Sequence, residues 1–134
     1  MTRSPAFSST ISLGALAVAA ILAIDAPAEA APRECFYSRS LSNWTDAGEG
    51  RVYLRVGVSD VYELKLAGSC PDLHFAESIG VETRGGSSNI CSGLDVNIIV
   101  PSSTTHTVPL RCMGTDLRKL SPEEAKALPA KLRP

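Results

Sequence analysis

RVYLRVGVSDVYELKL, the stretch from Arg51 to Leu66, decides the fold of this chain. Apolar and polar residues alternate in both halves, Arg51–Gly57 and Val61–Leu66, and a period of two indicates half-buried β-strands. The apolar faces consist of Val52, Leu54 and Val56 in the first run and Tyr62, Leu64 and Leu66 in the second. Because Gly57–Asp60 supplies turn residues between the runs, the stretch predicts an antiparallel hairpin.

Three further segments are predicted to be strands: Ser78–Thr83, Leu94–Val100 and Val108–Thr115. Alternation in the second of them should direct Leu94, Val96, Ile98 and Val100 inward. Arg84–Asn89 is rich in turn residues, and Pro101–Thr107 is a polar loop. We expect a single core that contains Leu54, Val56, Leu64, Leu66, Val96 and Ile98.

The end of the chain differs from the strand-rich middle. Ser121 followed by Pro122 and, three residues after the serine, Glu124 forms the capping box that begins a helix. Ala125–Leu128 completes this short helix, and the residues expected to hold it on the sheet are Leu117, Leu120 and Leu128. The predicted fold is therefore mainly β, a small antiparallel barrel or sandwich of about five to six strands with a short C-terminal helix and two disulfides.

The first thirty residues have the three parts of an export signal. Met1–Thr10 carries the cation Arg3, Ile11–Ile24 is uncharged, and Ala28-Glu29-Ala30 places small residues at the positions that a signal peptidase recognises. The uncharged run is shorter than the roughly 20 residues of a membrane-spanning helix. We predict a signal peptide over residues 1–30, one domain over residues 31–134, and a periplasmic or secreted protein without a stable membrane anchor.

Charge argues against two classes of partner. The whole chain has 13 basic and 14 acidic residues. The predicted signal peptide contains Arg3, Asp25 and Glu29, which leaves 12 residues of each sign in the remaining chain. The arginines are scattered along the sequence, whereas nucleic-acid binders concentrate basic residues on one surface. Nucleic acid and anionic membranes are therefore disfavoured, and the expected partner is a protein or another envelope component.

Cys35, Cys70, Cys91 and Cys112 all follow the predicted signal peptide. An even cysteine count in a small exported chain predicts disulfides. Zinc ligands occur in close pairs and redox sites use C-x-x-C, and the sequence has neither, so no metal or cofactor site is assigned. Four cysteines allow three pairings. Their positions favour Cys70 with Cys91, closing a local loop, and Cys35 with Cys112, joining the two ends of the domain.

No catalytic residue is assigned from the sequence. His74 or His106 could in principle combine with a serine and with Asp72 or Asp95, but no G-x-S-x-G motif is present. Isolated Ser, His and Asp residues are more often solvated or structural. Trp44, the single tryptophan, is more simply interpreted as a packing residue than as a recognition anchor.

A set of motifs between Cys35 and Leu120 resembles a family of small exported four-cysteine proteins of Gram-negative bacteria, whose function is unknown. The motifs are Cys35-Phe36, Arg51–Val56, Cys70-Pro71-Asp72-Leu73, Ile79–Thr83, Gly85-Gly86, Ile90-Cys91, Asp95 and Arg111-Cys112. The resemblance implies an exported four-cysteine domain and carries over no catalytic residue. Family members commonly have a shorter link before the last cysteine, so Pro101–Thr107 is a distinctive part of this chain.

Two hypotheses of function follow. In the first, the protein is a non-enzymatic binding or structural module of the cell envelope, which contacts its partner through the hairpin faces or the loop at residues 101–107. In the second, it is a small secreted hydrolase or enzyme inhibitor with an unrecognised site. A His-Asp-Ser cluster converging in a pocket would favour the second hypothesis.

Overall fold

The computed structural model describes residues 34–101 and 108–134. The predicted signal peptide, its cleavage site and His106 lie outside the described residues. The strands are β1 (Phe36–Tyr37), β2 (Leu41–Gly48), β3 (Arg51–Val56), β4 (Asp60–Leu66), β5 (Gly80–Thr83), β6 (Asn89–Ile90), β7 (Val96–Val100) and β8 (Leu110–Lys119). The α-helix is α1 (Pro122–Ala127), and the 3₁₀ turns are η1 (Ser38–Ser40), η2 (Leu73–Phe75), η3 (Arg84–Gly86), η4 (Gly93–Asp95) and η5 (Ala130–Leu132).

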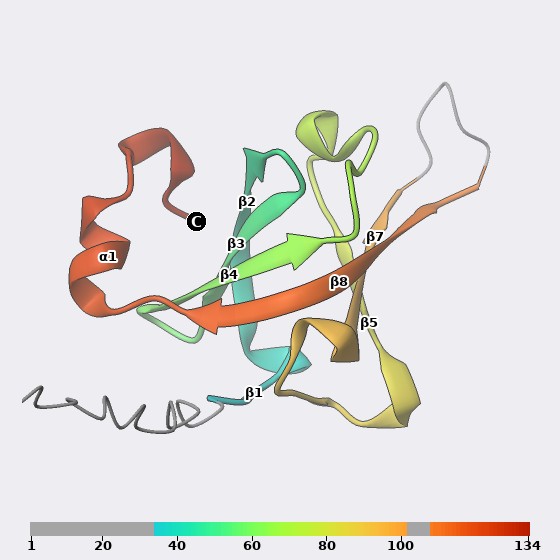
Figure 1. Ribbon diagram of the computed structural model, residues 1–134, viewed down its shortest axis with the longest axis horizontal. Coiled ribbons are helices and arrows are strands. Elements are labelled where there is room, and N and C mark those ends of the chain that lie inside the picture. The colour runs from blue at the N-terminus through green and yellow to red at the C-terminus, as the bar shows by residue number, and fades with distance from the viewer. Residues whose placement is uncertain (1–33, 102–107) are drawn as a thin grey trace, which may run out of the picture. The chain divides into compact units, whose positions relative to one another are not determined.

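Six strands form one antiparallel half-barrel sheet in the order β2-β3-β4-β8-β7-β5, and β1 and β6 form a small second sheet. The mainly β, antiparallel architecture with one short helix confirms the predicted fold class. The long strand β8 connects the two parts of the large sheet and crosses Figure 1 diagonally. Its first half pairs with β7, from Val100↔Leu110 to Asn97↔Met113, and its second half pairs with β4, from Leu66↔Gly114 to Tyr62↔Lys119.

The predicted hairpin is confirmed as β3 and β4. The pairs run from Arg51↔Lys65 to Val56↔Asp60 without a register shift. Gly57 adopts a φ of 62° in the connecting turn, a conformation that glycine adopts at low cost. An additional strand, β2, pairs with the outer edge of β3 and was not predicted.

The main core lies on one face of the large sheet and contains side chains from both of its parts. All six predicted core residues belong to it. Its buried members are Phe36, Val52, Leu54, Val56, Tyr62, Leu64, Leu66, Leu73, Ile90, Val96, Ile98 and Val100. Trp44 is partly buried against this cluster, which supports its interpretation as a packing residue.

A second, smaller cluster occupies the opposite face of β3 and β4. Tyr53, Val61 and Leu120 are buried there beneath Leu128 and Leu132, so α1 and η5 cover this face. The predicted capping box is present, because Ser121 Oγ accepts the Glu124 N–H and the Glu124 carboxylate accepts the Ser121 N–H. Leu120 and Leu128 hold the helix as predicted.

Two leucine predictions were wrong. Leu117 pairs with Leu64 and packs against the main core, on the face of the sheet that α1 does not cover. Leu94 was expected to point inward, but it lies in η4 and is 57% exposed. A capping box formed by Ser92 and Asp95 begins that turn, and the strand starts only at Val96.

The turn η4 crosses β8 with the two backbones in contact. A Cβ atom on Gly114 would collide with the carbonyl oxygen of Gly93, and a Cβ atom on Gly93 would collide with the backbone nitrogen of Asp116. Both glycines are buried. The crossing therefore requires a residue without a side chain on each of the two segments.

Two disulfides are present as predicted, but the predicted pairing was wrong. The bonds are Cys35–Cys91 and Cys70–Cys112. Pairing of β1 with β6 places Phe36 opposite Ile90, which brings Cys35 to Cys91. The end of β4 meets β8 at Gly114, and the Ala67 N–H donates to the Met113 carbonyl, so Cys70 lies beside Cys112. Strand pairing thus overrides the nearness of Cys70 and Cys91 in the sequence.

Candidate functional site

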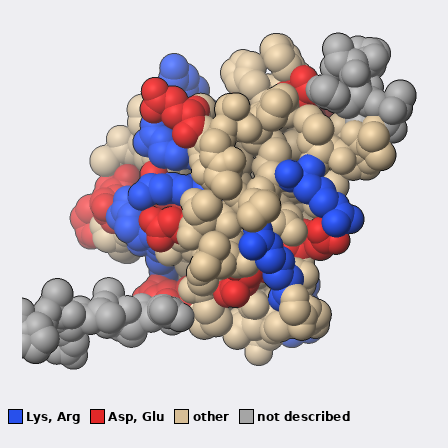
Figure 2. All heavy atoms as spheres, turned by 45° about the vertical axis from the view of Figure 1, so that its right-hand side comes forward, with Lys and Arg blue, Asp and Glu red and all other residues tan. Residues whose placement is uncertain are grey.

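An open groove of about 960 Å³ lies where the turn of the hairpin, the end of β8 and α1 meet. Its apolar lining includes Val61, Leu117, Leu120 and Ala125, which belong to or pack against the two cores. Five basic and three acidic side chains also line the groove, together with polar and uncharged residues such as Ser59, Ser121 and Pro134. Figure 2 shows basic and acidic side chains close together on the left of the view and again right of its centre, with uncharged atoms between the two groups.

Arg118 is held between two carboxylates. Its Nη1 lies 2.7 Å from Glu124 Oε1 and its Nη2 lies 3.0 Å from Glu63 Oε2. The hydrogen bond with Glu124, followed by that with Glu63, raises the pKa of Arg118 above its ordinary value. Two carboxylates therefore hold this single cation, so Arg118 is fully paired within the protein.

Lys119 is also held by two acids. Its Nζ is 2.9 Å from Glu34 Oε2 and 3.1 Å from Asp60 Oδ2, and these hydrogen bonds, that with Glu34 first, raise the pKa of Lys119. The ammonium group also lies 5.9 Å from the ring centroid of Tyr62. Burial raises the pKa of Tyr62, against the opposing effect of Lys119. Lys119 thus links Glu34, just before β1, to the large sheet.

Three other cations of the groove have no acidic partner. Arg133 donates from Nε to the Leu128 carbonyl at 2.9 Å and from Nη2 to the Lys126 carbonyl at 2.8 Å, at the C-terminal end of α1. These carbonyls position the guanidinium group without neutralising its charge. Across residues 34–101 and 108–134, no carboxylate lies within ion-pair distance of Arg55, Lys126 or Arg133. The groove therefore contains three cations without an ion-pair partner, next to two cations that are each paired with two acids.

The structure places His74 beside Asp46. Its Nδ1 lies 3.4 Å from Asp46 Oδ2, and the side chain is 80% exposed. Asp46 also accepts the Gly48 N–H through Oδ1. His74 does not line the groove, and the acid with which it forms an ion pair is Asp46.

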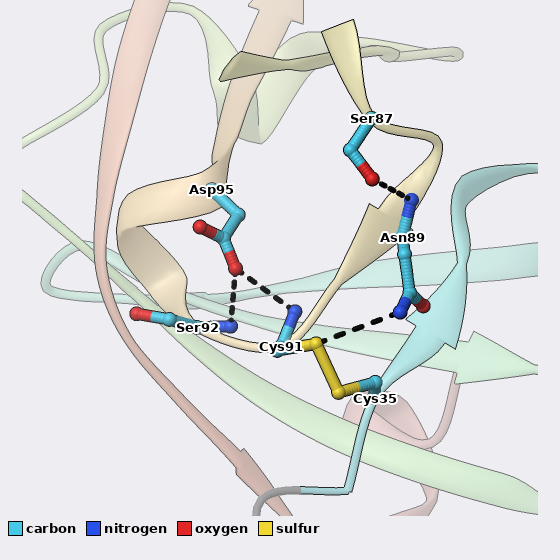
Figure 3. The surroundings of a disulfide bond; sticks show 6 residues. All are labelled: Cys35, Ser87, Asn89, Cys91, Ser92 and Asp95. Carbon is cyan, nitrogen blue, oxygen red and sulfur yellow. Dashed lines mark hydrogen bonds between the residues drawn. A yellow bond between two sulfur atoms is a disulfide. The ribbon is translucent and has the colours of Figure 1, made fainter. Parts of the chain in front are cut away.

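Asp95 has a structural role beside the Cys35–Cys91 disulfide. One oxygen of its carboxylate accepts the N–H groups of Cys91 and Ser92, at 2.9 and 2.8 Å (Figure 3). On the other side of Cys91, the Asn89 amide donates to the Cys91 sulfur at 3.7 Å. These contacts fix the turn that carries Cys91.

Most of the two hairpin faces is covered, and their accessible part is the end beside the groove, where Arg55 and Asp60 lie. Leu54 and Leu64 are buried in the main core on one face, and Tyr53 and Val61 are buried beneath α1 and η5 on the other. The apolar groove residue Val58, by contrast, is 94% exposed in the hairpin turn. The turn is thus accessible although the strands that it joins are covered.

A family model described as "Family of unknown function (DUF6491)" matches residues 1–134. The chain belongs to this family. The predicted resemblance to a family of unknown function is confirmed to that extent, and the DUF6491 match extends beyond the predicted range of Cys35 to Leu120. The family description names no organism, compartment or activity. No curated protein and no solved structure matches the chain.

Sequence reasoning missed the groove of this DUF6491 protein. Arg55, Lys126 and Arg133 are far apart in the sequence and have no shared motif. The groove forms only because α1 folds back over Tyr53 and Val61. Among the residues whose structure is described, no cluster of three or more His, Cys, Asp or Glu side chains could hold a metal ion. That part of the chain also contains no helix long and apolar enough to span a membrane.

Proposed function

We propose that this DUF6491 protein is an exported, non-enzymatic binding module of the cell envelope, and that the groove beside α1 receives its partner. One observation carries the proposal. The groove combines an apolar floor, formed by Val61, Leu120 and Ala125, with three cations that have no acidic partner among the described residues. Binding sites commonly combine an apolar surface with a few well-placed polar groups.

Two further features support this proposal. The structure contains two disulfides, Cys35–Cys91 and Cys70–Cys112. Because disulfides persist mainly in oxidising compartments, they support export from the cytoplasm. The groove's carboxylates all form ion pairs with Arg118 or Lys119, an arrangement suited to a fixed surface rather than to proton transfer. The hydrolase hypothesis is less favoured, because His74 is exposed and outside the groove.

Site-specific photocrosslinking in the native host tests the proposal. A photoreactive residue replaces Val58, which is 94% exposed in the groove, and Val108 serves as the control because it is 70% exposed and outside it. We expect a defined adduct with an envelope component from position 58 and none of that size from position 108. Identical adducts at both positions, no adduct at position 58, or recovery of the protein from the cytoplasm would contradict the proposal.

A further inference from the structure

We propose that the groove binds an acidic peptide segment of the partner, with Asp or Glu carboxylates placed against Arg55, Lys126 and Arg133. This inference rests on the proposed function and specifies the chemistry of the partner.

Charge complementarity is the first argument. The three carboxylates that line the groove, Glu34, Asp60 and Glu124, are already paired with Lys119 or Arg118. No internal acid of the described chain balances the three remaining cations. Ligand carboxylates could pair directly with these three cations, whereas a cationic ligand would find the groove's acids already engaged.

The position of the cations is the second argument. Arg133 is oriented by two carbonyls, and its Nη1 makes no hydrogen bond within the described part of the chain. Arg55 projects from β3, which is paired on both sides, by β2 and by β4. A guanidinium group matches a carboxylate through paired hydrogen bonds, and groups held in place before binding lose less conformational entropy.

The extent of the groove favours a peptide over a single small anion. Its lining comes from β3, β4, β8, α1 and the segment after η5, and it is open to solvent. The apolar floor of Val61, Leu120 and Ala125 lies beside the charged residues. Alternate side chains of an extended peptide point to opposite sides. A peptide in which acidic and apolar residues alternate would therefore direct its carboxylates to the cations and its apolar side chains to the floor.

Fluorescence polarisation on the oxidised chain from Ala31 to Pro134 tests this inference. The probe is a labelled short peptide in which Glu alternates with Val, and its matched control has Gln in place of Glu. We expect the Gln peptide to bind about ten- to hundredfold more weakly, as loss of a charge-assisted hydrogen bond implies. Arg55→Gln and Lys126→Gln should weaken binding of the Glu peptide by about tenfold each.

Lys131→Gln is the matched control variant. Lys131 lies in η5, is exposed and does not line the groove, so its substitution removes the same charge from a neighbouring surface. Thermal melts confirm that each variant is folded. Equal loss of binding in Lys131→Gln, equal binding of the Gln peptide, or displacement of the Glu peptide by equimolar inorganic phosphate would overturn the inference. Failure of the Glu peptide to bind, together with a Val58-specific adduct, would overturn it and leave the proposed function standing.

Discussion

Gly93 and Gly114 show how two single residues determine the path of β8. Each lies where a Cβ atom would enter the backbone of the crossing segment, so neither collision can be relieved by rotating a side chain. The crossing places η4 on β8 next to the point where the partner of β8 changes from β7 to β4. The absence of a side chain at these two positions therefore allows both parts of the sheet to share one strand.

Gly114→Ala should lower the free energy of unfolding by about 3 kcal/mol or more, the upper end of the range for overpacking of a buried site, because the collisions are with backbone atoms. Gly85→Ala is the comparison, because Gly85 has open space around it and only its φ of 75° opposes a side chain. That conformation costs about 1–2 kcal/mol in a residue other than glycine. Urea unfolding of the two variants measures the difference, and a smaller loss in Gly114→Ala would contradict the backbone contact.

At the scale of elements, the capping box of α1 makes its stability depend on pH. The Ser121 N–H, and after it the Arg118 guanidinium, lowers the pKa of the Glu124 carboxyl below its ordinary value. A group with a lower pKa in the folded state stabilises the fold above its unfolded pKa, and this contribution is lost as pH falls through the folded pKa. The helix should therefore be anchored less firmly in acid.

Glu124→Gln should lower the melting temperature at neutral pH, and the difference from the unmodified protein should shrink as the solution is acidified. Glu123→Gln is the control, because Glu123 is the adjacent acid in the first turn and its side chain forms no hydrogen bond or ion pair with the described residues. Thermal melts across the acidic range measure both variants. A pH-independent difference, or an equal effect of the two substitutions, would contradict the role of Glu124.

The elements that could be predicted from the sequence were those whose own residues carry a clear pattern for a strand or a helix. β3 and β4 alternate clearly, and α1 begins with a complete capping box. β2 contains Asn43, Asp46 and Gly48 and lacks alternation, so its strand conformation depends on pairing with β3. The disulfide pairing and the groove also depend on contacts between distant segments, which a pattern within one segment does not encode.

At the scale of the whole domain, the two disulfides differ in accessibility. Cys35 is exposed, whereas Cys70 and Cys112 are both half-buried. The bonds join residues 56 and 42 positions apart, and loops of this length correspond to about 4 kcal/mol each in the chain-entropy model. Both bonds should therefore contribute strongly to stability, and they should react with a reductant at different rates.

Gradual reduction under native conditions should expose Cys35 and Cys91 to alkylation before Cys70 and Cys112, because thiol exchange requires access to a sulfur atom. Mass spectrometry of samples alkylated at successive times measures the order. Before reduction, the peptide containing Cys35 should be joined to the peptide containing Cys91. Earlier labelling of Cys70 and Cys112, or a native Cys70–Cys91 peptide, would contradict the structure.

The central position of β8 also has a kinetic consequence. β2, β3 and β4 follow one another in the chain and can pair locally, but the inner edges of β4 and β7 remain uncovered until β8 arrives. Pairing between distant segments is slow, because loop closure precedes the stabilising contacts. Until then the two open edges can pair with other chains. Once β8 pairs with β4 and β7, both edges are covered and the chain is less prone to aggregate.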